Sequence, residues 1–351
     1  MQSMQEAPAA DLAFVCPRCK GELSIAASSY HCEYCAITYP VLFGIPDFRL
    51  RPDRYLSLEK EREKARRLFE FGQTSSFEQL VKYYYSITFD LPDDMVRRYQ
   101  ASILAGAERA RPILRQLKPR ADADLLIDLG CGTGGLLRAA RGRYRAVYGV
   151  DIALRWLVIA QKRLAEQGTT AKLVCADVES LPFRADTFTQ AVACDLVEHV
   201  YDIDSALREI GRVLKGRGVL WLSAVNRYCV GPHPLTGIWA IGFLPARPRA
   251  WVLTRLKGID LLRFTNMVSP GSIRRQVQNH GFDVLEARPK QTEGVAVAAY
   301  GASERGLIEL YRRAQRVPLL RRILLRIGPA FEMVCRKAGS RASGACSTSP
   351  C

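Results

Sequence analysis

Four cysteines close to the start of the chain are the first residues whose types and spacing imply a chemistry. They form two Cys-x-x-Cys pairs, Cys16 with Cys19 and Cys32 with Cys35, and twelve residues separate the pairs. Each pair can direct two thiolates at one ion, and two pairs complete the tetrahedral shell of a structural zinc site. A redox disulfide would need a single pair in a βαβ context. The spacing therefore predicts a structural Zn²⁺ site with no ligand position left open for catalysis.

A short β-hairpin suits the residues between the two pairs, with its strands at 23–25 and 29–31. An apolar run follows at 39–48 and closes the module. A unit of this size has too small a core to fold alone, so metal binding would supply most of its stability, on the order of 10–16 kcal/mol. In these features residues 14–48 resemble the Trm112-like zinc-ribbon domains that occur fused to, or partnered with, methyltransferases.

A second candidate site lies where an apolar strand runs into a glycine-rich turn. Residues 125–135 read LLIDLGCGTGG, and a helix is expected to follow directly. Glycines are needed there because the backbone must turn sharply and let a ligand approach without a Cβ in the way. The glycine string alone is weak evidence, since Gly130, Gly132 and Gly135 also fit the pattern of dinucleotide-binding proteins.

Acidic residues at the strand ends indicate which kind of cofactor the glycine turn binds. Asp151 is placed to bind two ribose hydroxyls, and Asp177 is placed to bind an adenine amino group. Asp128 comes two residues before the first glycine, and Asp195 ends the fourth strand. Four further strands are expected at 148–151, 173–177, 187–195 and 219–223. A glycine turn at 216–218 is expected before the last of them.

This order of elements, with Asp128 ahead of the glycines, resembles the class I S-adenosylmethionine-dependent methyltransferases of the type 11 group over residues 122–225. The resemblance implies an α/β fold with a Rossmann-like, seven-stranded sheet whose last strand is antiparallel. A helix at 272–280 and strands at 282–287 and 331–335 would complete that sheet. It also implies that S-adenosyl-L-methionine is bound by Asp128, Gly130, Cys131, Gly132, Gly134, Asp151, Ile152, Asp177, Val178 and Asp195.

The rest of the chain is organised around this domain. Between residues 49 and 118 apolar residues recur at helical spacing, and Pro92 with two following acids predicts the start of a long helix. The aromatic residues at 77–85 are expected to pack against the next domain, with a lid over a substrate as the alternative. The expected division is a zinc ribbon at 14–48, a helical linker or lid at 49–120, a methyltransferase domain at 121–338 with insertions at about 227–266 and 294–327, and a disordered tail at 339–351.

A hydroxyl acceptor would need a base, and the best pKa for that base lies near the ambient pH. His199 follows the fourth strand at the carboxyl edge of the sheet, where ligands of such folds bind, and is the candidate catalytic residue. Packing or capping is the alternative role, and Glu198 and His233 are weaker candidates. The Asn/Asp-Pro-Pro-aromatic motif of amino-methylating nucleic-acid enzymes is absent, because residues 195–198 read DLVE. Transfer to oxygen or carbon is therefore favoured.

Positive charge is concentrated in the C-terminal part of the chain. The whole chain has 51 Lys and Arg against 35 Asp and Glu, and residues 205–341 alone carry the entire surplus of 16. Its 48% hydrophobic and 25% charged residues are usual for a globular protein and exclude a mostly disordered or fibrous chain. A surface of one sign attracts nucleic acid, an anionic membrane or an acidic substrate.

Two segments of this basic part, 238–257 and 316–327, mix apolar residues with cations in the manner of an element lying in a membrane interface. The ordinary alternative is that the leucines are core and the arginines are solvated. The favoured function is methyl transfer to a small, hydrophobic or lipid-linked acceptor. The other hypotheses are an RNA methyltransferase that holds phosphates with the basic half and a non-catalytic cofactor-binding protein. No signal peptide or spanning run is visible, which predicts a cytoplasmic protein, with peripheral contact to an anionic membrane as an extension.

Overall fold

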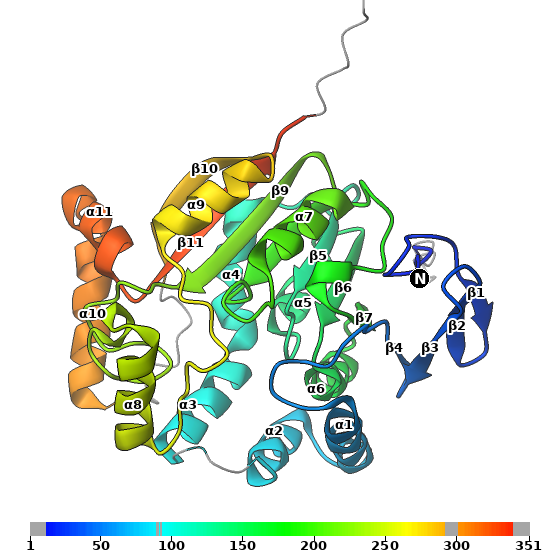
Figure 1. Cartoon of the computed structure of the whole chain (residues 1–351), viewed down its shortest axis with the longest axis horizontal. Coiled ribbons are helices and arrows are strands. Elements are labelled where there is room, and N and C mark those ends of the chain that lie inside the picture. The colour runs from blue at the N-terminus through cyan, green and yellow to red at the C-terminus, as the bar shows by residue number, and fades with distance from the viewer. Residues whose placement is uncertain (1–11, 89–90, 92, 292–300, 340–351) are drawn as a thin grey trace, which may run out of the picture.

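The computed structural model describes residues 12–88, 91, 93–291 and 301–339. A seven-stranded sheet lies at the centre, with helices on both faces and a small four-stranded sheet beside one edge (Figure 1). The strands of the central sheet are β5 (Leu125–Leu129), β6 (Ala146–Asp151), β7 (Lys172–Cys175), β8 (Phe188–Cys194), β9 (Leu214–Val225), β10 (Phe282–Pro289) and β11 (Ala330–Lys337).

The strand order of this sheet is β10-β11-β9-β8-β5-β6-β7. The five strands from β9 to β7 in that order run parallel, whereas β11 pairs antiparallel with both β9 and β10. The predicted Rossmann-like, seven-stranded sheet with an antiparallel last strand is therefore confirmed. The last predicted elements, at 272–280, 282–287 and 331–335, correspond to α9 (Pro270–Asn279), β10 and β11.

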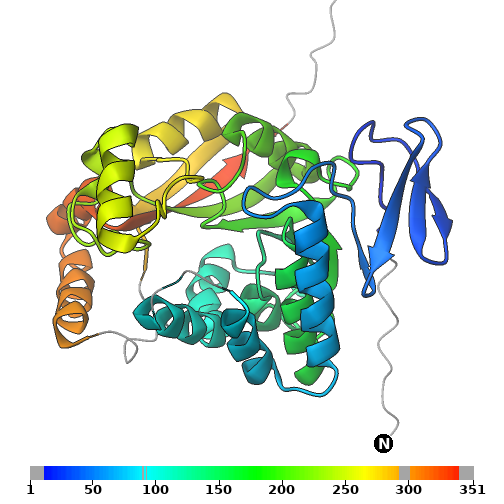
Figure 2. The ribbon, with the colours of Figure 1, turned by 60° about the horizontal axis from the view of Figure 1, so that its bottom comes forward.

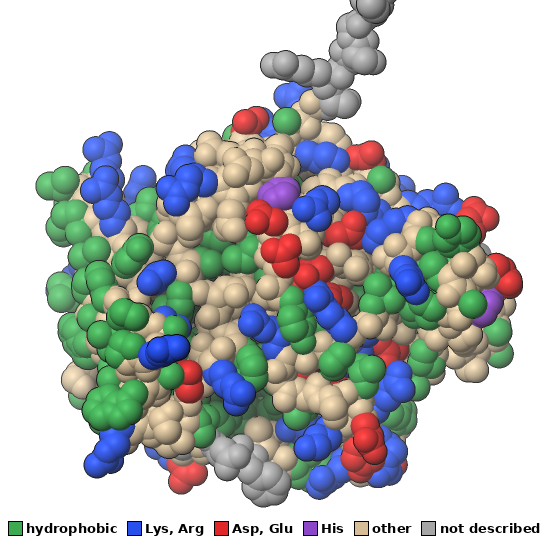
Figure 3. All heavy atoms as spheres, viewed as in Figure 1, with side chains coloured by type: hydrophobic (Ala, Val, Ile, Leu, Met, Phe, Trp, Pro, Cys, Tyr) green, Lys and Arg blue, Asp and Glu red, His purple; other side chains and the backbone are tan. Residues whose placement is uncertain are grey.

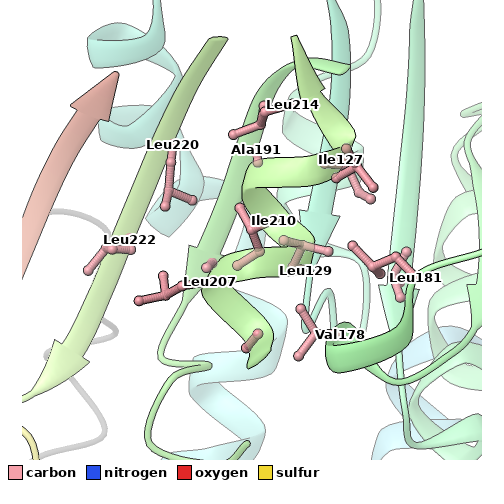
Figure 4. Packing of buried hydrophobic residues seen from close by; sticks show 14 of the residues in the cluster. Ile127, Leu129, Val178, Leu181, Ala191, Leu207, Ile210, Leu214, Leu220 and Leu222 are labelled. Atoms are coloured by element: carbon pink, nitrogen blue, oxygen red, sulfur yellow. The ribbon is translucent and has the colours of Figure 1, made fainter. Parts of the chain in front are cut away.

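Two layers of helices cover the sheet, and Figure 2 shows the blue-to-cyan layer on one face and the green and yellow helices on the other. The remaining helices of these layers are α1 (Leu58–Gly72), α2 (Phe77–Ser86), α3 (Asp93–Leu104), α4 (Gly106–Leu117), α5 (Gly135–Ala139), α6 (Leu154–Glu166) and α7 (Ile203–Val213). In the second layer, Leu207 and Ile210 of α7 are directed at the strands that carry Leu129 and Leu222 (Figure 4). Burial of apolar side chains on both faces holds the parallel strands in place.

The long helix predicted to start at Pro92 is instead two helices, α3 and α4, which meet at Ala105. The chain at Gly106 passes so close to the start of α5 that a Cβ on Gly135 would lie 2.8 Å from the carbonyl carbon of Gly106. Such a close approach of two backbones requires glycine. The aromatic residues of α2 pack inward as expected, because Tyr84 is buried and its ring lies 4.3 Å from that of Trp156.

A second difference concerns the predicted turn at 216–218. These residues belong to β9, and they bulge out of its pairing with β8. Phe188 lies opposite Leu214, but Gln190, only two residues later, lies opposite Val219. The glycines at both ends of the segment accommodate this irregularity, which a local reading of the sequence interprets as a turn.

The four-stranded sheet is attached to the edge of the central sheet at β7. Its strands are β1 (Ser24–Ala26), β2 (Ser29–Cys32), β3 (Ile37–Leu42) and β4 (Ile45–Pro46), and the first two form the predicted hairpin. Directly after β4, the backbone N–H of Phe48 donates to the carbonyl of Cys175 at 2.8 Å. Lys20 of this module forms a 2.7 Å ion pair with Glu209 of α7. The module is thus docked onto the central domain.

The two predicted insertions carry helices of their own at one side of the molecule, on the left in Figure 1. The first contains a small core formed by Ile241, Leu253 and Leu262. Residues 294–300 of the second, and residues 340–351 of the predicted tail, lie outside the described residues. The insertion helices are η2 (Ile241–Phe243), α8 (Ala246–Lys257), α10 (Ala302–Gln315) and α11 (Pro318–Ile327).

Candidate functional site

The four predicted metal ligands come together in the small sheet. One sulfur atom from each of Cys16, Cys19, Cys32 and Cys35 lies within 4.8 Å of all the others. The Sγ atoms of Cys16 and Cys35 are 3.9 Å apart, and those of Cys19 and Cys32 are 3.6 Å apart. A tetrahedral ion with bonds of about 2.3 Å would place its sulfur ligands about 3.8 Å apart. The cluster therefore has the dimensions of a zinc site with four thiolate ligands.

Hydrogen bonds to the sulfurs are also in place. The backbone N–H of Gly21 donates to the Sγ of Cys19 at 3.4 Å, and that of Cys35 donates to the Sγ of Cys32 at the same distance. The hydroxyl of Tyr39 lies 3.3 Å from the Sγ of Cys16. Such contacts orient thiolate ligands around a metal ion.

A cavity of about 320 Å³ opens at the carboxyl ends of β5, β6, β7 and β8, a volume in the range of ligand pockets. Most of the residues predicted from the sequence line it. They are Gly130, Gly132, Asp151, Ile152, Asp177, Val178, Asp195 and His199. Three other predicted residues belong to the same strand and turn without lining the cavity, namely Asp128, Cys131 and Gly134.

Asp151 holds the glycine turn in shape. Its carboxylate accepts a 2.9 Å hydrogen bond from the backbone N–H of Gly132 and a 2.8 Å bond from that of Ala153. Gly130, Gly132 and Gly134 all have positive φ angles, between 49° and 72°, which side chains other than glycine rarely adopt. The glycines and Asp151 thus form one unit, although nineteen positions separate Gly132 from the acid.

Two carboxyl groups beside the cavity are costly to ionise in the absence of a cationic ligand. Burial, with a contribution from the charge of Asp151, raises the pKa of Asp128 to about 8. Burial also raises the pKa of Asp151 to about 6, against the lowering effect of its two backbone hydrogen bonds. A cation bound here would favour both carboxylates. The ammonium and sulfonium groups of S-adenosylmethionine have the matching charge.

Asp177 is engaged by a residue that the sequence analysis did not identify. The Nε of Arg51 donates to Asp177 at 2.6 Å, its Nη2 lies 2.6 Å from Glu179, and its guanidinium lies 4.1 Å from the centre of the Tyr201 ring. The other oxygen of Asp177 accepts the N–H of Glu179 at 3.0 Å. Each carboxylate oxygen keeps a lone pair, so both remain able to accept a hydrogen bond from a ligand.

Residues 53–55, in the segment between the small sheet and α1, form part of the cavity wall. The buried guanidinium of Arg155 on α6 holds this segment through ion pairs with Asp53, at 2.8 Å, and with Glu61 of α1. Asp53 in turn accepts the backbone N–H of Tyr55 at 2.9 Å. The linker is therefore not a passive connection but one wall of the site.

Asp195 lines the cavity with its carboxylate already paired. Lys290, from just beyond β10, donates to it at 2.6 Å, and Ser223 donates at 2.9 Å. Although burial raises the pKa of Asp195, the charge and hydrogen bond of Lys290 lower it to about 2. Nothing in the sequence around Lys290 indicates this role.

The three candidate bases have different surroundings. The Nδ1 of His199 lies 2.9 Å from the hydroxyl of Tyr55, and burial lowers the pKa of His199. Glu198 is buried, its Oε1 accepts the N–H of Val225, and its Oε2 has no partner among the described residues. Burial raises the pKa of Glu198 to about 8. His233 is buried in the first insertion and does not line the cavity.

The sheet order, the glycine turn and the acids at the strand ends together define a class I S-adenosylmethionine-dependent methyltransferase. Residues 127–222 match the family model described as "Methyltransferase domain". That match and the relatives below show an S-adenosylmethionine-dependent methyltransferase domain in this chain.

Two curated relatives and one solved structure illustrate the similarity. The malonyl-[acyl-carrier protein] O-methyltransferase of Halorhodospira halophila is 28% identical over 232 residues, 64% of this chain and 75% of the relative. The ubiquinone biosynthesis O-methyltransferase of Azorhizobium caulinodans is 34% identical over 173 residues, 49% of this chain and 63% of the relative. The structure of an S-adenosylmethionine-dependent methyltransferase from Mesorhizobium loti aligns with 66% of this chain and 100% of its own, with 18% identity and a TM-score of 0.45.

The raised pKa of Asp128 predicts a pH-dependent stability without any ligand. The folded state holds the proton up to about pH 8, whereas an unfolded Asp loses it near pH 4, so the wild type loses stability as the pH rises between these values. The Asp128→Asn variant has no such proton to lose. Its stability relative to the wild type should increase by up to roughly 1.4 kcal/mol per pH unit in this window and level off above pH 8.

Urea unfolding of both proteins at several pH values between 5 and 8.5 measures this difference. Asp122→Asn, at an exposed position on the same approach to β5, serves as the matched control and should show no trend. A constant difference between Asp128→Asn and the wild type across this range would contradict the prediction.

Proposed function

We propose that the protein transfers the methyl group of S-adenosylmethionine to an oxygen or carbon atom of a small, hydrophobic acceptor. The observation that carries the proposal is the cavity itself. The glycine turn and the acids of three strand ends line it together with aromatic residues from separate segments, namely Tyr55, Trp156 and Tyr201. The acids suit a cationic cofactor, and the aromatic residues suit an apolar acceptor.

In this proposal the strand ends bind the cofactor in the order in which they lie along the sheet. The methionine end lies at the glycine turn, next to Asp128, where the ammonium group favours the ionised carboxylate. Asp151 and Ile152 serve the ribose, and Asp177 with Val178 serves the adenine edge. Asp195 forms the end of the cavity with its carboxylate held by Lys290.

S-adenosylmethionine supplies the methyl group as an electrophile whose leaving group needs no proton. The protein then has to align the acceptor with the methyl group, and such positioning can lower the activation barrier by roughly 7–11 kcal/mol. A hydroxyl acceptor must also lose a proton as it reacts. His199 lines the cavity, and burial keeps it neutral at physiological pH, so it is the base in this proposal.

The acceptor side of the cavity supports a small, partly aromatic or apolar substrate. Tyr55 of the linker contacts Phe264 of the first insertion edge to face, with ring centres 5.7 Å apart. Arg54 lies near both Phe264 and Tyr201. Both curated relatives described above are named O-methyltransferases, which agrees with transfer to oxygen.

An RNA methyltransferase is the second candidate function, because the basic C-terminal part could neutralise phosphates. The exposed arginines of α11, however, alternate with exposed leucines and isoleucine. Leu319 is 67% exposed, Leu320 41% and Ile323 44%. Phosphate binding gains little from apolar side chains, so this surface favours a lipid over a polynucleotide.

Incubation of the protein with methyl-labelled S-adenosylmethionine and cell extract tests the proposal. We expect label in a small product that partitions into organic solvent. His199→Ala should lower turnover by roughly 100-fold or more while the affinity for S-adenosylhomocysteine, measured by calorimetry, changes less than about threefold. His31→Ala, in the small sheet, is the matched control.

Label in an aqueous polymer that is sensitive to RNase would show that the acceptor is RNA and not a small molecule. Binding of S-adenosylhomocysteine without any labelled product from extract would favour the non-catalytic hypothesis. Unchanged turnover of His199→Ala would remove this residue from the mechanism.

We further propose that the face formed by α8, α10 and α11 contacts an anionic membrane. None of the residues of α10 or α11 is buried. Figure 3 shows apolar and basic side chains side by side over this part of the molecule. Trp251 and Leu256 of α8 are 70% and 63% exposed, and α8 and α11 contain several arginines but no acidic residue. This combination matches the charge of an anionic leaflet and its apolar interior.

The position of this face also suits delivery of a lipid-linked acceptor. The insertion that carries α8 also supplies Phe264, whose ring contacts that of the cavity residue Tyr55. Among the helices that the structure describes, none combines the length and apolar character needed to cross a bilayer. Contact with the membrane would therefore be peripheral.

Liposome flotation tests the membrane contact. The wild type should float with vesicles that contain anionic lipid at low salt, and less so at high salt. Each cation contributes roughly 1 kcal/mol, so Arg321→Gln with Arg322→Gln should weaken binding by about tenfold or more. Leu319→Ser with Ile323→Ser should also weaken it, whereas Ile25→Ser, exposed on the small sheet, should not. Absence of flotation under every condition would overturn this part of the proposal.

The four-cysteine cluster is proposed to hold one structural zinc ion. The sulfur separations fit a tetrahedral ion, and the ligand set of four thiolates leaves no position for a substrate. The metal would stabilise the small sheet and, through Phe48 and Cys175, the edge of the central sheet to which it is attached.

Elemental analysis should therefore find about one zinc per chain in the purified wild type. Cys16→Ser or Cys32→Ser should lose the metal and expose the small sheet to limited proteolysis. Cys229→Ser, which changes a buried cysteine outside the cluster, should keep it. A wild-type protein without metal would contradict the proposal.

A further inference from the structure

Tyr55 lines the cavity and contacts two other segments that are distant from it in sequence. It belongs to the linker before α1, its hydroxyl lies 2.9 Å from the Nδ1 of His199, and its ring contacts Phe264 of the first insertion edge to face. Both Tyr55 and His199 line the cavity. The hydroxyl of Tyr55 is therefore in a position to control the histidine from outside the methyltransferase core.

The backbone of Tyr55 is tied to the core through Asp53. Its N–H donates to Asp53 at 2.9 Å, and Asp53 is fixed by the buried Arg155. Phe264 packs against the ring on one side. One contact thus restrains the backbone of Tyr55 and the other restrains its ring, in a residue that is 52% exposed overall.

We propose that Tyr55 is a positioning residue that holds His199 in the tautomer with the proton on Nδ1. In this arrangement Nδ1–H donates to the hydroxyl oxygen of Tyr55, and Nε2 carries the lone pair. The proposal rests on the function proposed above, in which His199 is the base.

This direction of the hydrogen bond is the one that serves the reaction. During transfer to a hydroxyl acceptor, the acceptor oxygen forms a bond to the methyl carbon, the carbon–sulfur bond breaks with its electron pair going to sulfur, and the acceptor proton passes to Nε2 of His199. The resulting imidazolium has a proton on both nitrogens, so Nδ1 must donate. An accepting Tyr55 oxygen therefore fits His199 before and after the proton transfer, without rearrangement.

Other charged groups near His199 do not supply an alternative partner for Nδ1. Asp195 acts on the histidine through its charge and is itself paired with Lys290. Arg54 also faces His199, but its Nη1 donates to the carbonyl of Val200 at 2.9 Å. Among the described residues, Tyr55 is the hydrogen-bond partner of Nδ1.

Nitrogen-15 NMR of the histidine side chains tests this proposal without any acceptor. The chain has four histidines, so the signals of His199 can be assigned by their loss in His199→Gln. We expect the wild type at neutral pH to show a protonated Nδ1 and an unprotonated Nε2 at His199. Tyr55→Phe, which keeps the ring against Phe264 but removes the hydroxyl, should shift His199 toward the Nε2–H tautomer.

The controls separate positioning from general damage. Tyr34→Phe, on the exposed surface of the small sheet, should leave the His199 signals unchanged. In Tyr55→Phe the signals of His233 and His280 should stay in place, which shows that the fold is intact. A wild-type His199 with its proton on Nε2, or a Tyr55→Phe spectrum identical to the wild type, would overturn the proposal. Neither result would contradict methyl transfer itself, which the labelling experiment measures separately.

Discussion

The buried guanidinium of Arg155 is the interaction on which the geometry of the site depends. It stands in the first turn of α6, directly after the strand end that carries Asp151, and it pairs with Asp53 of the linker and Glu61 of α1. Glu61 also accepts the backbone N–H of Arg155 and so caps the start of α6. A guanidinium buried without partners would cost several kcal/mol. The linker and α1 must therefore stay against the core for α6 to start where it does.

This constraint explains why the linker forms a wall of the cavity. Because Arg155 holds Asp53, the next residues, Arg54 and Tyr55, are placed over the site, and Arg51 reaches Asp177. The small sheet contributes indirectly, since its last strand leads into this segment, which is hydrogen-bonded to β7 through Phe48. The N-terminal part and the methyltransferase core thus pack together, and the cavity is lined by the glycine turn and strand ends of the core and by residues 53–55 of the linker.

The sequence was sufficient to predict the features that are local in the chain. The strands, the glycine turn and the cluster of four cysteines each depend on spacing within a few dozen residues, and the structure places them as expected. The partners of the acids could not be predicted in this way. Lys290 and Asp195 are 95 positions apart, and Arg51 and Asp177 are 126 apart. No periodicity links such pairs, because only the packing of whole elements brings them together.

The structure also shows that negative and positive side chains gather in different regions, although the composition gives only one net positive charge. Carboxyl groups gather in and beside the cavity, and two of them, Asp151 in its lining and Asp128 beside it, are costly to ionise until a cation binds. About half of the positive surplus lies instead on the insertion helices α8, α10 and α11, which carry ten Lys and Arg against two Glu and expose several apolar residues. In the proposal, a cationic cofactor and an anionic membrane would be attracted to different parts of the molecule, so neither would compete with the other. The first insertion joins these parts, because it carries α8 at one end and Phe264 beside Tyr55 at the other.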